Sequence, residues 1–394
     1  MNDTNFPIRI KHKGNPGNIM MMYISALKMQ TILGFGKIHN VSIPLFNIDI
    51  PDHILRNKSG IHDSFHGNGQ NKGRIPFAGY KKFIENYHCD FLSLEGLYQN
   101  IHNFPPLHQI PYNEIFPPLN MTHTFGGEED LVIHIRGGDI LAGISDMYCL
   151  LPPEFYEYLI NQTQKRPIFY GQLDQSPYLD EIKNRFPNAI YINSQGAEKD
   201  FDFIRKAKHI VLCLSTFSWM AAWLSSAQNI YMPVAGLFNP AHHFYGNLLP
   251  TKDPRYHFFL FPLYFAKHVN EYRSYLDPIR KMWTTVSPTD LERIYYENHP
   301  SLDDELLSLD YKFLSESSSN YSSLYREWNE KGVLNLFTSQ YNAPKQPFFS
   351  IDRAFYISQN PMIGMEISLG IYKNEIDHYL MKGQYLGYKT HQSS

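Results

Sequence analysis

The stretch Leu-Val-Ile-His-Ile-Arg-Gly-Gly-Asp occupies residues 131–139 and decides the fold class. Its branched apolar residues predict a short buried strand, and the glycine pair predicts a turn at its end. The turn places His134, Arg136 and Asp139 at the carboxyl edge of a sheet, where open α/β sheets bind ligands. Glycine permits close approach of a ligand, and an arginine fork fits a phosphate. The alternative interpretation is a buried strand with an ordinary glycine turn and a surface arginine.

Strand and helix patterns alternate from residue 128 onward. Strands are predicted at 131–136, 167–171, 189–193, 209–214 and 229–232. The helices between them are predicted at 153–161, 178–186, 200–206 and 217–226. Alternation at this spacing predicts a parallel, doubly wound sheet. A strand at 7–10 and a helix at 19–33 begin an earlier unit of the same kind, so the expected fold class is α/β.

Two further stretches combine turn-forming residues with predicted helices. The sequence Gly-Asn-Pro-Gly-Asn at residues 14–18 precedes the first helix. The sequence Ser-Thr-Phe-Ser-Trp at residues 215–219 opens a later helix, and Asp200 leads the helix before it. A Ser-Thr turn that opens a helix offers hydroxyls and free backbone N–H groups to an anion.

In their order along the chain, the three stretches resemble the motifs of the fucosyltransferase superfamily, most closely the α-1,2-fucosyltransferases of bacterial surface-polysaccharide type. Residues 14–18 match the loop GGxGNQ, and residues 134–139 match the motif HxRRGD. Residues 215–219 match the segment NS[ST]FSWW, with Asp200 as the leading acid. The resemblance covers about the first 240 residues.

The chain departs from these motifs at several positions. Ile19 replaces a Gln, Gly137 the second Arg, Leu214 an Asn and Met220 the second Trp. These departures concern the donor and acceptor details more than the fold.

The resemblance implies a GT-B-like architecture, with two Rossmann-like halves around a cleft and, in this chain, a mostly helical C-terminal extension. We expect an N-terminal acceptor-side α/β domain at residues 1–127, a donor-binding Rossmann-like domain at 128–285 and the helical extension at 286–394. Loops at 59–79 and 98–125, rich in turn-forming residues, are expected to carry the acceptor specificity.

The function that the resemblance implies is an inverting, metal-independent glycosyltransferase. It would move L-fucose from GDP-fucose to a galactose-type hydroxyl of a glycan in an α-1,2 linkage, with the GDP-sugar as substrate and no cofactor. Two alternatives stay open. One is a GT-B transferase that uses another GDP-sugar, which Gly137 suggests, and the other is a non-catalytic glycan-binding or assembly subunit.

The resemblance assigns nine residues to the donor nucleotide: Asn18, His134, Arg136, Gly138, Asp200, Ser215, Thr216, Phe217 and Ser218. His134 and Asp200 would flank the guanine, whose adjacent N–H donors suit a carboxylate. Arg136 and the Ser-Thr turn would hold the diphosphate. Arg136 and Asp139 are the expected catalytic residues. Asp139 either takes the acceptor proton or braces Arg136 or the glycine turn, and Asp146 and Asp174 are the other acids considered as the base.

Structural roles compete with these assignments. His134 can be a core histidine, and Asp200 can be an acid in the first turn of a helix. Asp200-Phe201-Asp202 also matches the DxD pattern of metal-dependent glycosyltransferases. It lies at the front of a predicted helix rather than on a strand-end loop, so no metal is expected.

Composition restricts the partners and the compartment. A net charge of −3 without a basic block argues against nucleic acid. Three cysteines without a CxxC or zinc pattern fit a reducing compartment. The N-terminus is polar, and the apolar stretch at 210–224 is too short for a membrane span. These features predict a cytoplasmic enzyme, with peripheral attachment to the inner face of the membrane left open.

Residues 349–387 resemble a short module appended to bacterial surface-polysaccharide glycosyltransferases. The pattern predicts packed amphipathic helices, and no chemistry is assigned to them.

Overall fold

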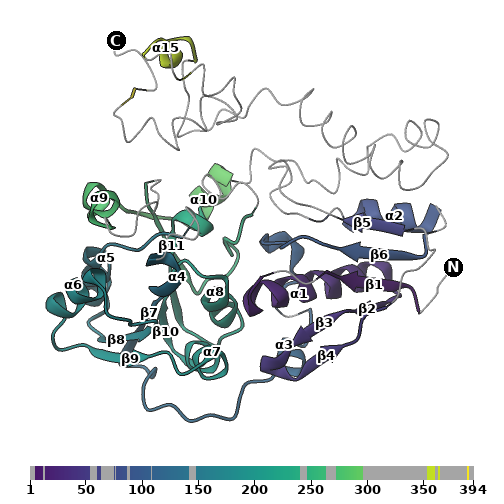
Figure 1. Cartoon of the computed structure of the whole chain (residues 1–394), viewed down its shortest axis with the longest axis horizontal. Helices are drawn as coiled ribbons and strands as arrows, with labels where there is room; N and C mark the ends of the chain where they lie inside the picture. The colour runs from purple at the N-terminus through teal and green to yellow at the C-terminus, as the bar shows by residue number, and fades with distance from the viewer. Residues whose placement is uncertain are drawn as a thin grey trace.

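The computed structural model describes residues 5–11, 14–53, 60–63, 75, 77–86, 89–107, 109–141, 148–239, 246–262, 272–295, 353–359, 363 and 388–389. Two α/β units lie side by side, one on each side of Figure 1. Each is built on its own parallel sheet, which confirms the predicted α/β class and is consistent with a GT-B-like fold of two domains.

The N-terminal unit contains a four-stranded parallel sheet of order β2-β1-β6-β5. Its elements are β1 (Pro7–Ile10), α1 (Pro16–Leu33), β2 (Lys37–His39), β5 (Gly60–Asp63), α2 (Phe77–Asn86) and β6 (Phe91–Leu94). A hairpin of β3 (Val41–Ile43) and β4 (Ile48–Ile50), joined by η1 (Pro44–Phe46), lies outside this sheet. The predicted loop at 59–79 needs correction, because it contains β5 and the start of α2. Pairing with β6 makes residues 60–63 a strand.

The C-terminal unit contains a seven-stranded sheet of order β13-β12-β11-β10-β7-β8-β9, parallel except for β13. The strands are β7 (Asp130–Ile135), β8 (Arg166–Gly171), β9 (Ile190–Asn193), β10 (His209–Val211), β11 (Asn229–Val234), β12 (Tyr256–Leu260) and β13 (Thr284–Val286). The helices between them are α4 (Gly138–Leu141), α5 (Pro153–Thr163), α6 (Pro177–Arg185), α7 (Ala197–Lys206), α8 (Thr216–Trp223) and η3 (Gly236–Phe238). The chain adds strands outward from β7 in both directions, so the order reverses beside β7. In open α/β sheets this switch point is where ligands bind.

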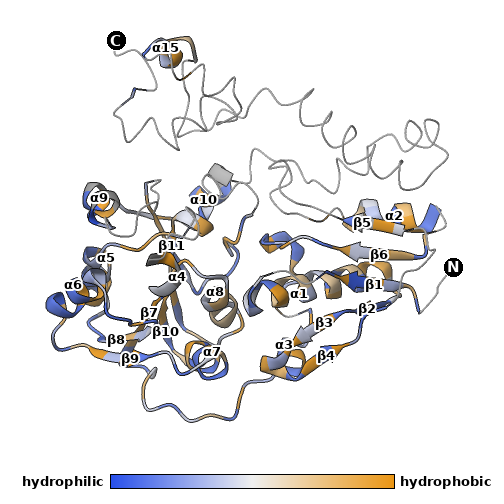
Figure 2. Ribbon diagram, viewed as in Figure 1, coloured by the Kyte–Doolittle hydropathy of each residue, from blue (hydrophilic) through white to orange (hydrophobic). Residues whose placement is uncertain are grey.

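Every strand and helix predicted between residues 131 and 232 is present, with shifted ends. The helix predicted from residue 200 begins at Ala197, and the strand predicted at 209–214 ends at Val211. The central strand β7 is buried along its whole length, as its apolar sequence requires. Figure 2 shows β7 and β10 mostly in orange, whereas α6 at the rim carries blue residues.

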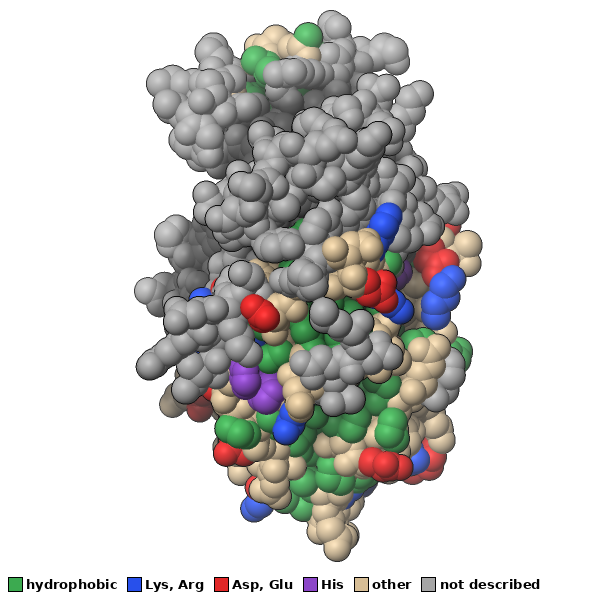
Figure 3. Space-filling model, turned by 90° about the vertical axis from the view of Figure 1, so that its right-hand side faces the viewer, with side chains coloured by type: hydrophobic (Ala, Val, Ile, Leu, Met, Phe, Trp, Pro, Cys, Tyr) green, Lys and Arg blue, Asp and Glu red, His purple; other side chains and the backbone are tan. Residues whose placement is uncertain are grey.

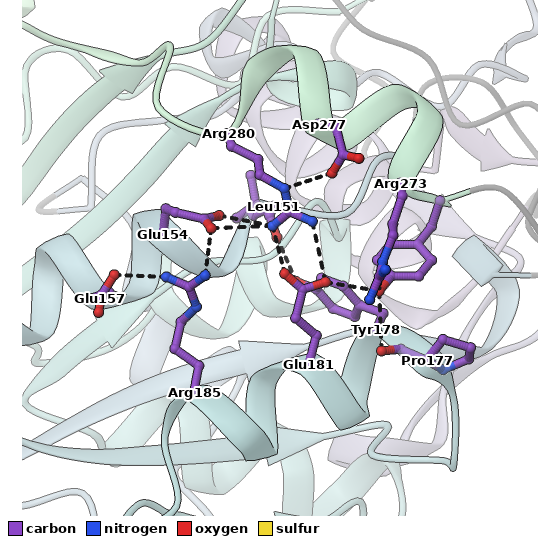
Figure 4. Close-up of polar contacts among 11 residues, drawn as sticks. Leu151, Glu154, Glu157, Pro177, Tyr178, Glu181, Arg185, Arg273, Asp277 and Arg280 are labelled. Atoms are coloured by element: carbon purple, nitrogen blue, oxygen red, sulfur yellow. Dashed lines mark hydrogen bonds and ion pairs between the residues drawn. The ribbon is translucent and has the colours of Figure 1, made fainter.

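The helices α9 (Tyr272–Leu276), η5 (Asp277–Ile279) and α10 (Pro288–Tyr295) lie beyond the last parallel strand, β12, with β13 between η5 and α10. An ion-pair network ties η5 to α5 and α6 (Figure 4). In it, Arg280 bonds Glu154 at 3.2 Å and Glu181 at 2.6 Å. Glu154 also pairs with Arg185 at 2.7 Å.

The predicted domain boundary at 285/286 falls inside β13 and remains a prediction. Beyond it, α10 and α15 (Arg353–Ser358) are helical, as expected for the extension. The rest of the extension, including most of the module at 349–387, lies outside the described residues.

The two units pack through α1 and α8 and through aromatic side chains. Phe104 belongs to the linker between β6 and β7 (residues 95–129) and lies 5.8 Å from Trp219 and 5.6 Å from Trp223, measured between ring centroids. Phe46 of the N-terminal unit meets Phe201 of α7 at 5.5 Å. On the face of the molecule seen in Figure 3, the coloured basic and acidic side chains are interspersed rather than gathered into one basic patch.

Candidate functional site

Two helices begin at the contact between the units. In the first turn of α1, a Cβ at Gly17 would lie 2.8 Å from backbone atoms of Thr216 and Phe217, so only glycine permits this approach. Neither α1 nor α8 has a side-chain N-cap hydrogen bond or an acid in its first turn. The first N–H groups of a helix have no partner within the helix and carry partial positive charge. Two such ends close together favour an anion.

Predicted ligand residues gather at this contact. Asn18 is buried, and its Oδ1 accepts a hydrogen bond of 2.8 Å from Gln99. Ser215 and Thr216 lie at the buried start of α8. Phe217 is half-buried and packs edge-on against Phe201, and its contact with the nucleotide remains a prediction.

Ser218 is placed differently from the other three hydroxyl and aromatic residues of the segment. Its side chain is fully buried, and the Oγ donates to the Ser215 carbonyl at 3.2 Å. Contact with a diphosphate would require this bond to break, so the predicted contact between Ser218 and the ligand remains a prediction.

The strand edge beside this contact carries His134 and Asp200. His134 of β7 is the register partner of Tyr170 of β8, and the Tyr170 hydroxyl donates to Asp200 Oδ1 at 2.6 Å. The Gln195 N–H donates to the same oxygen at 2.8 Å, and the Ser194 hydroxyl donates to Oδ2. A carboxylate has about four acceptor positions. Three bonds therefore leave Asp200 one position for a ligand.

His134 is a buried, neutral imidazole. Burial lowers its pKa to about 4, the nearby Arg136 acts in the same direction, and Asp200 opposes both. Its Nδ1 lies 2.9 Å from the Sγ of Cys213, which follows β10. The structure thus brings His134 and Asp200 to one edge, as the motifs predict.

The glycine turn after β7 holds the remaining predicted residues. Arg136 is half-buried, with its guanidinium 4.5 Å from the centre of the Tyr148 ring. The Gly138 N–H donates to the side chain of Gln172 at 3.0 Å. Asp139 lies in α4, but its side chain is outside the described part of the structure, so both of its roles remain predictions.

The two carboxylates of the DxD pattern have separate partners. Asp202 is buried and bonds His123 at 2.7 Å and Lys206 at 2.8 Å, whereas Asp200 bonds the groups given above. The pair therefore does not form one cradle for a cation. In the described ranges, no group of three His, Cys, Asp or Glu side chains is arranged for a metal ion.

Sequence reasoning missed Tyr170, Gln172 and Cys213. Tyr170 and Gln172 flank Gly171, which has a φ of +123°. A Cβ there would lie 2.3 Å from the Ile135 carbonyl oxygen, so β8 ends on an obligatory glycine beside β7. A glycine as the last residue of a predicted buried strand is the available signal. The sequence pattern bears on Cys213 only through cysteine spacing and pairing, and in the structure it is a free thiol.

No protein-family model matches this chain. An α-1,2-colitosyltransferase from Escherichia coli is 25% identical over 169 residues, which cover 39% of this chain and 58% of that protein. The aligned part of the chain therefore spans less than two thirds of this relative's length. Over that part, the chain is similar to a glycosyltransferase. The similarity supports the glycosyltransferase prediction and does not distinguish one donor sugar from another. Among the helices that the structure describes, none is both long and apolar enough to cross a membrane.

Proposed function

We propose that this protein is an inverting glycosyltransferase that moves L-fucose from GDP-fucose to a galactose-type hydroxyl of a glycan. The observation that carries the proposal is the contact of the two helix N-termini of α1 and α8 beside His134, Asp200 and Arg136. Anchoring a nucleotide diphosphate requires positive charge for the phosphates and polar groups for the base. This edge of the sheet supplies both.

The chemistry follows from where charge develops. When the glycosidic bond breaks, the leaving β-phosphate gains negative charge, and dipoles or cations already aimed at it lower the barrier. The first turns of α1 and α8 and the Arg136 guanidinium are suited to that task. The acceptor hydroxyl must lose a proton, and Asp139 is the motif acid proposed to take it.

Another GDP-sugar is the second candidate donor. Two observations favour it: Gly137 stands where the family has a second arginine, and the similar Escherichia coli protein is named for colitose transfer. Both candidate donors are GDP-sugars, so both would bind through the same proposed contacts to the guanine and the diphosphate.

A donor screen tests the proposal. The full chain is incubated with GDP-fucose, GDP-colitose, GDP-mannose and UDP-sugars, together with a galactoside acceptor, and nucleotide release is measured. Release from GDP-fucose that persists in EDTA is the expected result. Preference for another GDP-sugar would support the second candidate, and use of UDP-sugars alone would overturn both.

The variant Arg136→Ala separates a catalyst from a binding subunit. We expect kcat/KM to fall about 100-fold or more, because a charge-stabilising group is lost. The exposed Lys183 on α6 provides the control, and Lys183→Ala should keep wild-type turnover. A wild-type protein that binds glycans but releases no nucleotide from any donor would favour the non-catalytic alternative.

A further inference from the structure

Three buried polar side chains form a row behind the candidate site. His134 Nδ1 lies 2.9 Å from Cys213 Sγ, and Cys213 Sγ lies 3.6 Å from Ser218 Oγ. Their exposed fractions are 7%, 5% and 0%. Because water has little access to the row, its hydrogen bonds are made with protein groups, and these two contacts join its members.

The direction of the hydrogen bonds can be derived from the far end of the row. Ser218 has one hydroxyl proton, which it donates to the Ser215 carbonyl, an obligatory acceptor, at 3.2 Å. The Ser218 oxygen therefore faces Cys213 as an acceptor, and the thiol proton points to it. The sulfur in turn presents its lone pairs to Nδ1 of His134.

We propose that Cys213 and Ser218 are positioning residues that hold the His134 proton on Nδ1, leaving Nε2 as a bare acceptor for an N–H donor of the guanine base. This inference rests on the proposed nucleotide site. It specifies that His134 accepts, and the guanine base donates, in the hydrogen bond between them. The tautomer of a histidine is set by the hydrogen bond that its other nitrogen makes.

The surroundings of Nε2 agree with this role. A Cβ at position 171 would lie 3.1 Å from Nε2, so Gly171 leaves that edge of the ring uncovered. Within the described residues, Nδ1 is the only ring nitrogen of His134 with a hydrogen-bond partner. The low pKa keeps the ring neutral, so one nitrogen remains an acceptor near pH 7.

Nitrogen-15 NMR of histidine-labelled full chain tests the tautomer directly, and the His134→Gln variant assigns the signal. Wild type should show a protonated Nδ1 and an unprotonated Nε2. In Ser218→Ala the thiol loses its acceptor and can donate to Nδ1, so the proton should move to Nε2. Cys213→Ser keeps a hydroxyl in the row and should retain the wild-type pattern. A wild-type proton on Nε2, or no change in Ser218→Ala, would overturn the proposal.

Titration with GDP tests the consequence for binding. Ser218→Ala should bind GDP about tenfold more weakly, because the Nε2–H of His134 would then face an N–H donor of the guanine base. Cys213→Ser should bind GDP as wild type does. Equal affinity in all three proteins would overturn the base-reading role. If wild type shows the expected tautomer but binds no GDP, the proposed function fails and the positioning of His134 by Cys213 and Ser218 stands.

Discussion

His134 is held neutral by the folded protein, since burial lowers its pKa from an ordinary 6.5 to about 4. As pH falls, the unfolded chain takes up this proton first, which favours the unfolded state. Above pH 6.5 this group therefore does not change the free energy of unfolding. As the pH falls from 6.5 to about 4, the free energy of unfolding decreases. We predict a loss of about 3 kcal/mol over this window from His134 alone. Urea unfolding between pH 7 and pH 4.5 measures the loss.

The variant His134→Gln is the control, because other histidines titrate in the same range. Burial also lowers the pKa of His39, His209 and His257. The difference between wild type and variant isolates the contribution of His134. Parallel losses of stability in the two proteins would contradict the prediction.

Helix α1 can approach α8 only because residue 17 is glycine. In Gly17→Ala the new Cβ would meet the Thr216 carbonyl group and the Phe217 nitrogen at 2.8 Å, and these backbone atoms cannot move aside cheaply. We predict a loss of about 1–3 kcal/mol in the free energy of unfolding, because overpacking forces the helices apart. GDP affinity should fall as well, which isothermal titration measures.

Gly127→Ala is the matched control for this substitution. A Cβ at Gly127 meets no atom within 4 Å, so its stability and GDP affinity should match wild type. A Gly17→Ala protein that behaves like the control would show that the two helix ends do not need this contact.

The elements differ in how far the sequence predicts them. Strands β7, β8 and β11 are runs of branched or aromatic residues bounded by turns, and local pattern suffices for them. Strand β5 has four residues with little pattern, and it is a strand because β6 pairs with it. At the candidate site, the motifs predict His134 and Asp200. The contacts of Tyr170 with Asp200 and of Cys213 with His134 depend on the strand order β10-β7-β8, which cannot be predicted from local sequence patterns.

Elements α5, α6 and η5 are joined by the network around Arg280 (Figure 4). The Arg280 guanidinium contacts Glu154, Glu181 and Asp277, and these carboxylates raise its pKa against the opposing effect of burial. Replacement by Met leaves Glu154, which is buried, and Glu181 with fewer partners. We predict that Arg280→Met lowers the free energy of unfolding by about 3 kcal/mol, as measured by urea denaturation.

Lys252→Met removes an exposed ion pair with Glu292 and serves as the control. Its effect should stay below about 1 kcal/mol, because surface pairs contribute little. Equal losses in both variants would mean that the Arg280 network stabilises no more than a surface pair does.

At the scale of the whole molecule, the described residues contain one main hydrophobic core and, in the tail, two further buried residues. The main cluster of buried hydrophobic residues runs through both sheets and the linker. Tyr356 and Ile363 are also buried but do not belong to that cluster. Tyr356 packs edge-on against Tyr388 at 6.2 Å, and Gln359 exchanges two hydrogen bonds with the backbone of Lys389. These contacts join residues of the tail to one another.

Deletion of residues 345–394 should consequently leave GDP binding close to wild type. All nine residues assigned to the donor nucleotide lie before residue 219, and the contacts just described join tail residues to one another. Solubility should fall if the deletion uncovers apolar surface.

Titration with GDP checks the binding, and circular dichroism checks that the truncated chain is folded. Tyr356→Ala in the full chain is the milder control and should also bind GDP normally. A truncated protein that is folded but no longer binds GDP would show that the tail completes the proposed nucleotide site, and the predicted boundary between the two α/β units and the extension would then have to move.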